Sequence, residues 1–201
     1  MSSGPRTVRQ KLLQLNNIPS LFSHNLIPKA AVFYHIMKAV VLYRSKYGST
    51  KQYAEWIAEE LGADIFPADA FSPEQFALYD TVVFGAPVFG GAVLGIAAVA
   101  DHMDVLRDKR LFVFTVGLTP PDAEQSLADL AEKNYPATLM KHAEFFHFRG
   151  ALDAKKLTFG HKILLKMINS SMRNKLDMHQ NHVSRKAIFP LTEAARGEKN
   201  A

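Results

Sequence analysis

From residue 37 onward, short runs of apolar, β-prone residues alternate with longer stretches in which apolar residues repeat every three or four positions. In residues 50–61, for example, Tyr53, Ile57 and Leu61 share one helical face. The expected strands are 39–44, 64–66, 81–85, 110–117 and 143–149, and the expected helices are 50–61, 92–106, 122–132 and 157–176, with a compact helix beginning at 72–75. Five strands alternating with helices predict an α/β protein built on a parallel, doubly wound sheet.

Three loops follow the long buried strands, at residues 45–50, 85–91 and 117–122. The carboxyl ends of parallel strands meet at one edge of a sheet, and doubly wound folds bind ligands at that edge, where the strand order reverses. We therefore expect the three loops to form one ligand site. Asp122, at the end of the third loop, is expected to cap helix 122–132.

The first loop has the features of an anion site. It reads Ser-Lys-Tyr-Gly-Ser-Thr, and a helix pattern starts directly after it. The free N–H groups and the dipole of a helix N-terminus attract an anion. Ser45, Ser49 and Thr50 add hydroxyl donors, while Gly48 lets the backbone approach a ligand closely. This pattern predicts a phosphate ester as the ligand.

Other phosphate-binding and phosphoacceptor motifs do not fit this loop. The glycine spacings of the P-loop and of the dinucleotide-binding fingerprint are both absent. A receiver domain would need acidic residues at the end of the first strand, where this chain has Tyr43, Arg44 and Ser45.

The composition limits the chemistry that the chain can perform alone. The 201 residues include no cysteine, which excludes disulfides, thiolate catalysis and iron–sulfur ligation. A redox reaction would therefore require a bound cofactor. The eight histidines are scattered without metal-ligand spacing, so we predict no metal site, and we assign no catalytic side chain. No stretch approaches the roughly 20 apolar residues of a membrane-spanning helix.

The net charge of +5 is unevenly distributed. Residues 37–140 hold 8 basic and 14 acidic residues, whereas residues 141–186 hold 10 basic and 3 acidic ones. The basic balance is thus local and does not indicate a nucleic-acid-binding protein. On helix 157–176, a row of basic residues runs beside an apolar stripe. This pattern fits a solvated face on a core-packed helix, or contact with an anionic membrane surface or an acidic redox partner.

Residues 1–36 differ from the remainder of the chain. They carry four basic residues, no acid and no clear period, and Met37 stands just before the first strand. An upstream start or added extension, a targeting segment and a packed extension all fit this composition. We therefore treat residues 1–36 as an N-terminal extension, which would be either non-native or disordered if it comes from an upstream start or an added extension. We treat residues 37–201 as the domain.

The loop at 45–50 resembles the phosphate loop of flavodoxins, Ser/Thr-x-Thr-Gly-x-Thr, with Tyr47 in place of a hydroxyl residue. Loops 85–91 and 117–122 look like the two loops that hold the isoalloxazine ring in that superfamily. The resemblance spans about residues 38–176. It implies a flavodoxin-like three-layer sandwich with strand order 2-1-3-4-5, non-covalent FMN and electron transfer.

The resemblance also implies which residues contact FMN. From the first loop they are Ser45, Lys46, Tyr47, Gly48, Ser49 and Thr50; from the second, Ala86, Pro87, Val88, Phe89, Gly90 and Gly91; and from the third, Gly117, Leu118, Thr119 and Asp122. Phe89 is the expected aromatic neighbour of the ring. A carboxylate at Asp122 would disfavour an anionic reduced flavin and so lower its potential.

The C-terminal half is similar to the flavodoxin-like protoporphyrinogen oxidases that pass electrons to menaquinone. The matching segments are 148–152 and the Lys- and Met-rich helix 161–168. The region after Gly117 is shorter than in that oxidase, and we expect no full closing helix after Arg185. Three functions follow as alternatives: an FMN electron carrier, an oxidase with a quinone acceptor, and an FMN-less binding module. The expected partners are a redox protein or a quinone, and the expected location is the cytoplasm, with peripheral contact at the inner face of the membrane.

Overall fold

A computed structural model describes residues 38–155, 157–171 and 177–197 of the chain. The chain divides into two units, Met1–Ile36 and Met37–Ala201, and the described residues all belong to the second. The predictions for residues 1–36, and the end of the predicted basic helix at 172–176, lie outside the described residues.

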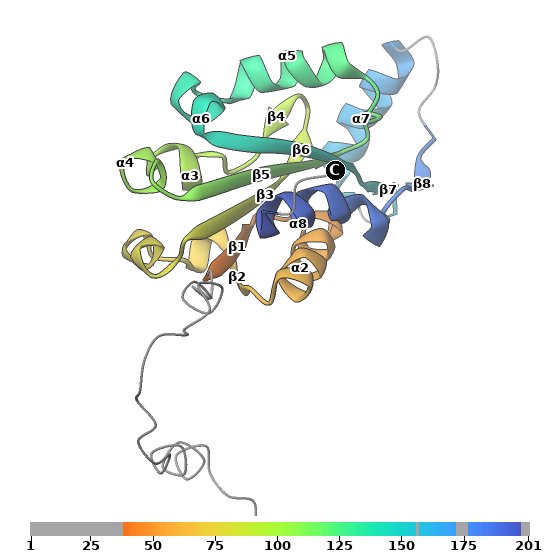
Figure 1. The fold of residues 1–201 in the computed structure, drawn as a ribbon. Coiled ribbons are helices and arrows are strands. Elements are labelled where there is room, and N and C mark those ends of the chain that lie inside the picture. The colour runs from red at the N-terminus through yellow and green to blue at the C-terminus, as the bar shows by residue number, and fades with distance from the viewer. Residues whose placement is uncertain (1–37, 156, 172–176, 198–201) are drawn as a thin grey trace, which may run out of the picture. The chain divides into compact units, whose positions relative to one another are not determined.

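A parallel sheet forms the centre of the fold (Figure 1). Its strands are β1 (Ala39–Tyr43), β2 (Asp64–Pro67), β3 (Thr81–Phe89), β5 (Arg110–Gly117) and β6 (Ala143–Arg149). They follow the order β2-β1-β3-β5-β6, and every neighbouring pair is parallel. This confirms the predicted order 2-1-3-4-5 for the five main strands and the doubly wound α/β class.

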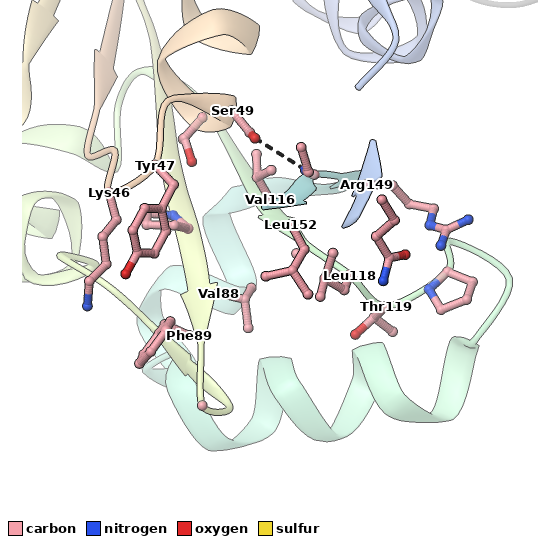
Figure 2. Close-up of a pocket in the computed structure, with 18 of the residues that line it drawn as sticks. Lys46, Tyr47, Ser49, Val88, Phe89, Val116, Leu118, Thr119, Arg149 and Leu152 are labelled. Carbon is pink, nitrogen blue, oxygen red and sulfur yellow. Dashed lines mark hydrogen bonds between the residues drawn. The ribbon is translucent and has the colours of Figure 1, made fainter. Parts of the chain in front are cut away.

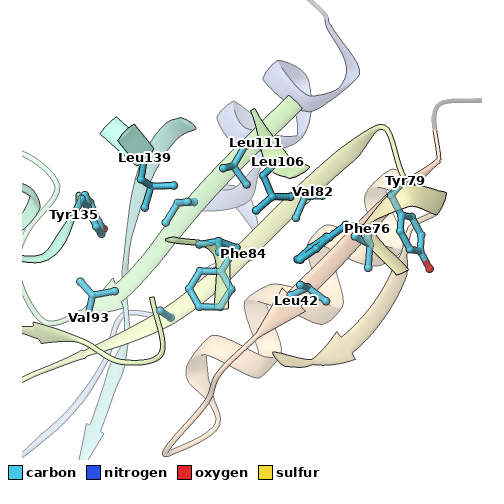
Figure 3. Packing of buried hydrophobic residues seen from close by; sticks show 14 residues of the cluster. Leu42, Phe76, Tyr79, Val82, Phe84, Val93, Leu106, Leu111, Tyr135 and Leu139 are labelled. Atoms are coloured by element: carbon cyan, nitrogen blue, oxygen red, sulfur yellow. The ribbon is translucent and has the colours of Figure 1, made fainter. Parts of the chain in front are cut away.

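Helices cover both faces of the sheet because successive strand residues point to opposite sides. Val40 and Leu42 of β1 enter one apolar cluster, whereas Val41 enters the other. The first cluster, drawn in Figure 3, packs against the 3₁₀ helix Pro73–Leu78 and the helices α3 (Ala97–Ala100), α4 (Met103–Leu106), α5 (Glu124–Asn134) and α6 (Ala137–His142). The second packs against α2 (Ser49–Leu61) and α8 (Phe189–Arg196).

The second predicted loop, 85–91, is largely strand. β3 pairs with β5 as far as Pro87 and then, through Val88 and Phe89, with the short antiparallel strand β4 (Ala92–Val93). Gly90 and Gly91 both have positive φ, 59° and 78°, which a tight hairpin turn requires. The ligand-edge segment is therefore a rigid β-hairpin rather than a loop.

The predicted helix 92–106 was also wrong as one element. Its first residues form β4, and Gly95 takes a φ of 80°, which no helix residue adopts. A Cβ at Gly95 would lie 2.6 Å from Arg44 Cδ, which a movement of that side chain could relieve, so the positive φ is the stronger reason for glycine here. Only two separate single-turn helices, α3 and α4, remain of the expected long helix.

Two predictions about helix ends are corrected. Asp122 lies in the turn before α5, and Ala123 occupies the N-cap position without a side-chain hydrogen bond. After Arg185 a closing helix does form, because the 3₁₀ turn Arg185–Ile188 leads into α8, which buries Leu191 and Ala195 against the sheet. Two other helix ends carry regular caps: Gly62 ends α2 at a φ of 61°, and Ser72 N donates to Gln75 Oε1 (3.0 Å) at the start of Pro73–Leu78.

An insertion separates β6 from α8. It contains the antiparallel strands β7 (Ala151–Asp153) and β8 (His179–Asn181) with helix α7 (Phe159–Ser171) between them. Figure 1 shows these elements at the end of the sheet to which β5 and β6 point. Within the described part of the chain, no helix combines the length and apolar character needed to cross a bilayer.

Candidate functional site

A cavity of about 780 Å³ opens at the carboxyl edge of the sheet (Figure 2). Residues from all three predicted loops and from the β7–α7–β8 insertion form its walls. Figure 2 shows Lys46, Tyr47 and Phe89 at one side and Thr119 and Arg149 at the other. The deep walls are apolar. The edge of the sheet thus holds a concave, mostly apolar site with polar groups at its rim, as small-ligand sites generally do.

Loop 45–50 brings unpaired donors to this cavity. Gly48 adopts a φ of 99° and precedes α2, whose first intrahelical hydrogen bond runs from Gln52 N to Gly48 O (3.0 Å). The N–H groups of Ser49, Thr50 and Lys51 come before that bond, as at any helix start. Ser49 and Thr50 line the cavity, although Thr50 is only 2% exposed. The dipole of α2 and these donors favour an anion here.

Two predicted ligand contacts in this loop have other roles. The Ser45 hydroxyl accepts the Gly48 N–H (3.2 Å) and so braces the loop from outside the cavity lining. The Tyr47 hydroxyl is hydrogen-bonded to Nδ1 of His161, on α7. Tyr47 therefore ties α7 to the loop instead of offering a free hydroxyl to a ligand.

The tip of the β3–β4 hairpin joins the same contact with α7. The rings of Phe89 and His161 are 4.4 Å apart between centroids, and Lys46 Nζ lies 4.1 Å from the Phe89 centroid. Lys46 Nζ is also 3.1 Å from His161 Nε2. Lys46, Tyr47, Phe89 and His161 thus form one cluster, which we call the α7 contact, at the rim of the cavity.

The third loop is held in place by a histidine of the neighbouring strand. His147 Nε2 donates to the carbonyl oxygen of Thr119 (3.1 Å), and its Nδ1 lies 2.8 Å from Thr115 Oγ1. Because the carbonyl can only accept, Nε2 carries the proton and Nδ1 of the neutral ring accepts from the threonine hydroxyl. Burial lowers the pKa of His147, with the bond to Thr119 opposing that shift. The ring is therefore a neutral, fixed support for residues 117–119.

The end of β6 closes the floor of the site. Tyr53, on α2, donates from its hydroxyl to the carbonyl of Arg149 (2.8 Å) and accepts from Ser184 N (3.1 Å). Gly150 N donates to Gly117 O (2.7 Å), which joins the third loop to β6. Ala151 N donates to Ser49 Oγ (3.3 Å), the bond drawn dashed in Figure 2. Three segments far apart in sequence are thereby locked around the cavity.

Arg149 carries an unused donor beside the cavity. Its Nε is buried and has no hydrogen-bond partner among the described residues. A buried donor without a partner costs about 1–3 kcal/mol, so a ligand acceptor at this position would remove a penalty from the protein. The cationic guanidinium also adds positive charge to the wall opposite Lys46.

The structure brings most of the predicted contact residues together. Those lining the cavity are Lys46, Tyr47, Ser49, Thr50, Pro87, Val88, Phe89, Gly90, Gly117, Leu118 and Thr119. Five are not part of the lining: Ser45, Gly48, Ala86, Gly91 and Asp122. Ala86 is fully buried in the core, and Asp122 is exposed, so the expected influence of its carboxylate on a bound flavin loses its geometric support.

Sequence reasoning missed the wall contributed by the insertion and its neighbours. The additional lining residues are Val116, Pro120, Ala123, Ser126, Arg149, Gly150, Ala151, Leu152, Leu157, Asp177 and Gln180. The segment 149–152 carried a usable signal, because it follows the carboxyl end of the fifth strand and must reach the same edge as the other loops. Asp177 and Gln180 carried none, since only the pairing of β7 with β8 returns them to the site.

Comparisons with known proteins gave a match to one family model and matches to solved structures. A family model described as a flavodoxin domain matches residues 40–179. Among solved structures, flavodoxin 2 from Bacillus cereus is 21% identical, with 56% of this chain and 84% of that chain covered and a TM-score of 0.42. A WrbA-like flavodoxin protein from Agrobacterium tumefaciens is also 21% identical, with 81% and 99% covered and a TM-score of 0.42. The search of curated protein sequences found no match.

Proposed function

This chain belongs to the flavodoxin domain family, and on that premise we propose that it binds FMN non-covalently in the 780 Å³ cavity and transfers electrons through it. The observation that carries the proposal is the pairing of two chemically different regions in one cavity. A helix N-terminus with hydroxyl donors lies at one place in its wall, and apolar side chains form much of the remaining wall. A planar aromatic phosphate ester has the same two parts.

The phosphate end of FMN fits the loop before α2. The N–H groups of Ser49 and Thr50 are unused by the helix, and both hydroxyls belong to residues in the cavity wall. The Tyr47 hydroxyl is hydrogen-bonded to His161. Ser49 and Thr50 must therefore bind the phosphate without the third hydroxyl residue that the flavodoxin loop usually has. Gly48 does not line the cavity; its φ of 99° lets the loop turn into the first residue of α2.

The ring of FMN fits the apolar part of the cavity. Val88 and Val116 come from the strand ends, while Leu118 and Leu152 come from the segments that follow them. Arg149 also lines the cavity, and its Nε, which has no hydrogen-bond partner among the described residues, would need to turn into the cavity to donate to a polar ring atom. FMN, when bound, supplies the reversible gain and loss of electrons, and the protein positions it, excludes water and sets the polarity around it. No acid or base from the chain is required for that role.

A second candidate is an FMN-dependent oxidoreductase of the protoporphyrinogen oxidase type, with a quinone as acceptor. One observation favours an enzyme: the insertion adds Leu157, Asp177 and Gln180 to the cavity wall. These residues extend the site beyond the three loops expected to hold FMN, and an organic substrate could occupy that extension. Assay of the FMN-loaded chain with protoporphyrinogen and a quinone, each omitted in turn, tests this candidate.

The colour and redox behaviour of the purified full-length chain test the main proposal. The chain should carry a flavin absorption spectrum, or acquire one on addition of FMN, and should then pass electrons from a chemical reductant to a one-electron acceptor. A chain that ignores FMN would instead be a flavodoxin-fold binding module. If the chain binds FMN but reduces no acceptor, the proposed cofactor would be supported and the proposed electron transfer would be contradicted.

A further inference from the structure

A second cavity, of about 470 Å³, lies between α7 and the β7–β8 hairpin, and its lining is strongly basic. Its walls are formed by Ala154, Lys155, Lys162, Lys166, Met178 and His179. None of the three lysines forms an ion pair with any residue that the structure describes. The carboxylate of Asp153 lies beside His179 Nδ1 (3.3 Å) and accepts the backbone N–H of Lys155 (2.9 Å), so one carboxylate borders a cleft that holds three lysines. The cleft therefore has positive charge available for an anionic group such as a phosphate.

An apolar row runs along α7 beside the lysines of this cleft. Phe159, Ile163 and Met167 follow each other at four-residue spacing, with exposed fractions of 80%, 47% and 63%. Lys162 and Lys166 follow Phe159 and Ile163 by three positions each, so the two rows are neighbours on the helix surface. Exposed apolar side chains flanked by lysines characterise helices that lie in the interface of an anionic bilayer.

We propose that α7 docks on an anionic phospholipid surface. Phe159, Ile163 and Met167 enter the boundary between headgroups and acyl chains, and the lysine cleft takes a phosphate headgroup. The aliphatic stems of Lys162 and Lys166 cover the edge of the apolar row while their ammonium groups reach the headgroups. An acidic protein would satisfy the lysines but would leave the apolar row in water, which is why the row favours lipid.

Docking through α7 would also bring the first cavity to the membrane. His161 is on the same helix but faces away from the apolar row, and its contacts with Tyr47 and Phe89 join α7 to the cavity rim. The membrane proposal does not depend on FMN binding, because none of the residues of the lysine cleft lines the first cavity.

Vesicle co-sedimentation of the purified full-length chain tests the docking surface. The chain should sediment with phosphatidylcholine vesicles that contain phosphatidylglycerol and remain in solution with phosphatidylcholine alone. The double variant Lys162→Gln/Lys166→Gln should bind the anionic vesicles about 30-fold more weakly, the loss expected for two lysines at an anionic surface. The double variant Phe159→Ser/Met167→Ser should also bind the anionic vesicles more weakly, and it should still not bind phosphatidylcholine alone.

A matched control separates this surface from general charge. Lys141→Gln/Lys186→Gln removes the same charge from exposed positions outside α7 and should retain most of the binding. An unchanged circular dichroism spectrum and an unchanged urea-unfolding midpoint show that each variant is folded. Equal binding to neutral and anionic vesicles, no binding to either, or equal losses in the two lysine pairs would overturn the proposal. Binding to a purified acidic redox protein without any vesicle binding would overturn it too.

Discussion

His147 Nε2 donates a hydrogen bond to the carbonyl oxygen of Thr119 across 3.1 Å, and this bond fixes the third loop of the site to β6. The other ring nitrogen is engaged by Thr115 Oγ1 at 2.8 Å. Both contacts are made by the neutral ring. Protonation would leave the bond to Thr119 intact and would let Nδ1 donate to Thr115 Oγ1, but it would place a charge in a largely buried setting, so burial is what disfavours the protonated ring.

The stability of the protein should consequently fall in mild acid. The pKa of His147 is lowered in the folded state from its ordinary value of 6.5, chiefly by burial. Below that value the unfolded chain binds more protons than the folded chain. The contribution of the neutral His147 ring to the free energy of unfolding is therefore fully present above pH 6.5 and is lost as the pH falls toward the folded-state pKa. The His147→Gln variant should show a shallower loss of unfolding free energy between about pH 8 and about pH 5 than the parent chain, measured by urea denaturation. Identical slopes for the two proteins would contradict the assignment.

Gly48 should be intolerant of a side chain for conformational reasons alone. Its φ of 99° is unfavourable for L-residues, yet a Cβ there would meet nothing within 4 Å. Gly48→Ala should therefore cost about 1–2 kcal/mol of unfolding free energy and weaken FMN binding. Gly160→Ala is the matched control, because that position is equally open and has no positive φ. Equal effects at the two glycines would exclude backbone strain as the cause.

Ser49 and Thr50 should carry the hydroxyl part of phosphate binding. The double variant Ser49→Ala/Thr50→Val preserves shape and should raise the dissociation constant for FMN by roughly 10- to 100-fold, as expected for lost hydrogen bonds to a charged group. Flavin fluorescence quenching measures this change. Thr138→Val/Ser170→Ala makes the same chemical changes outside the cavity and should leave the affinity unaltered. A phosphate held elsewhere would leave both double variants equal to the parent.

Tyr53 should support the site from beneath. Its side chain is fully buried, and its hydroxyl bonds both the Arg149 carbonyl and Ser184 N. Tyr53→Phe leaves both groups without that partner and should cost about 1–3 kcal/mol in urea unfolding. Tyr43→Phe is the control, since the Tyr43 hydroxyl has no hydrogen bond to a described residue. If both variants lost the same stability, the hydroxyl bridge would have no special role.

The sequence predicted the sheet well because buried parallel strands leave a strong local signal. The apolar run 110–117 matches β5 residue for residue, and 143–149 matches β6. The hairpin after β3 was missed because Pro87 and the glycines that follow were interpreted as loop residues. In fact Gly90 and Gly91 supply the two positive φ angles of the turn, while β5 continues to pair with β3 as far as Pro87.

The site could be predicted where it depends on the ends of parallel strands or on one short loop. Lys46 to Thr50 lie on one short loop, so their clustering follows from the sequence. The α7 contact does not, because His161 reaches Tyr47 from more than a hundred residues away. The place of Gln180 in the cavity wall could not be predicted either, because it depends on the pairing of Gln180 with Leu152 between β8 and β7. Long-range closure by an insertion leaves no periodic signal in either segment.

Titration of the purified, flavin-free chain with FMN and, separately, with riboflavin tests the central claim most directly. The two ligands share the ring and the ribityl chain and differ by the phosphate alone. If the α2 N-terminus holds the phosphate and the apolar walls hold the ring, FMN should bind at one equivalent per chain and about 100-fold more tightly than riboflavin. Equal affinities for the two flavins, or no spectral change with either, would contradict the account.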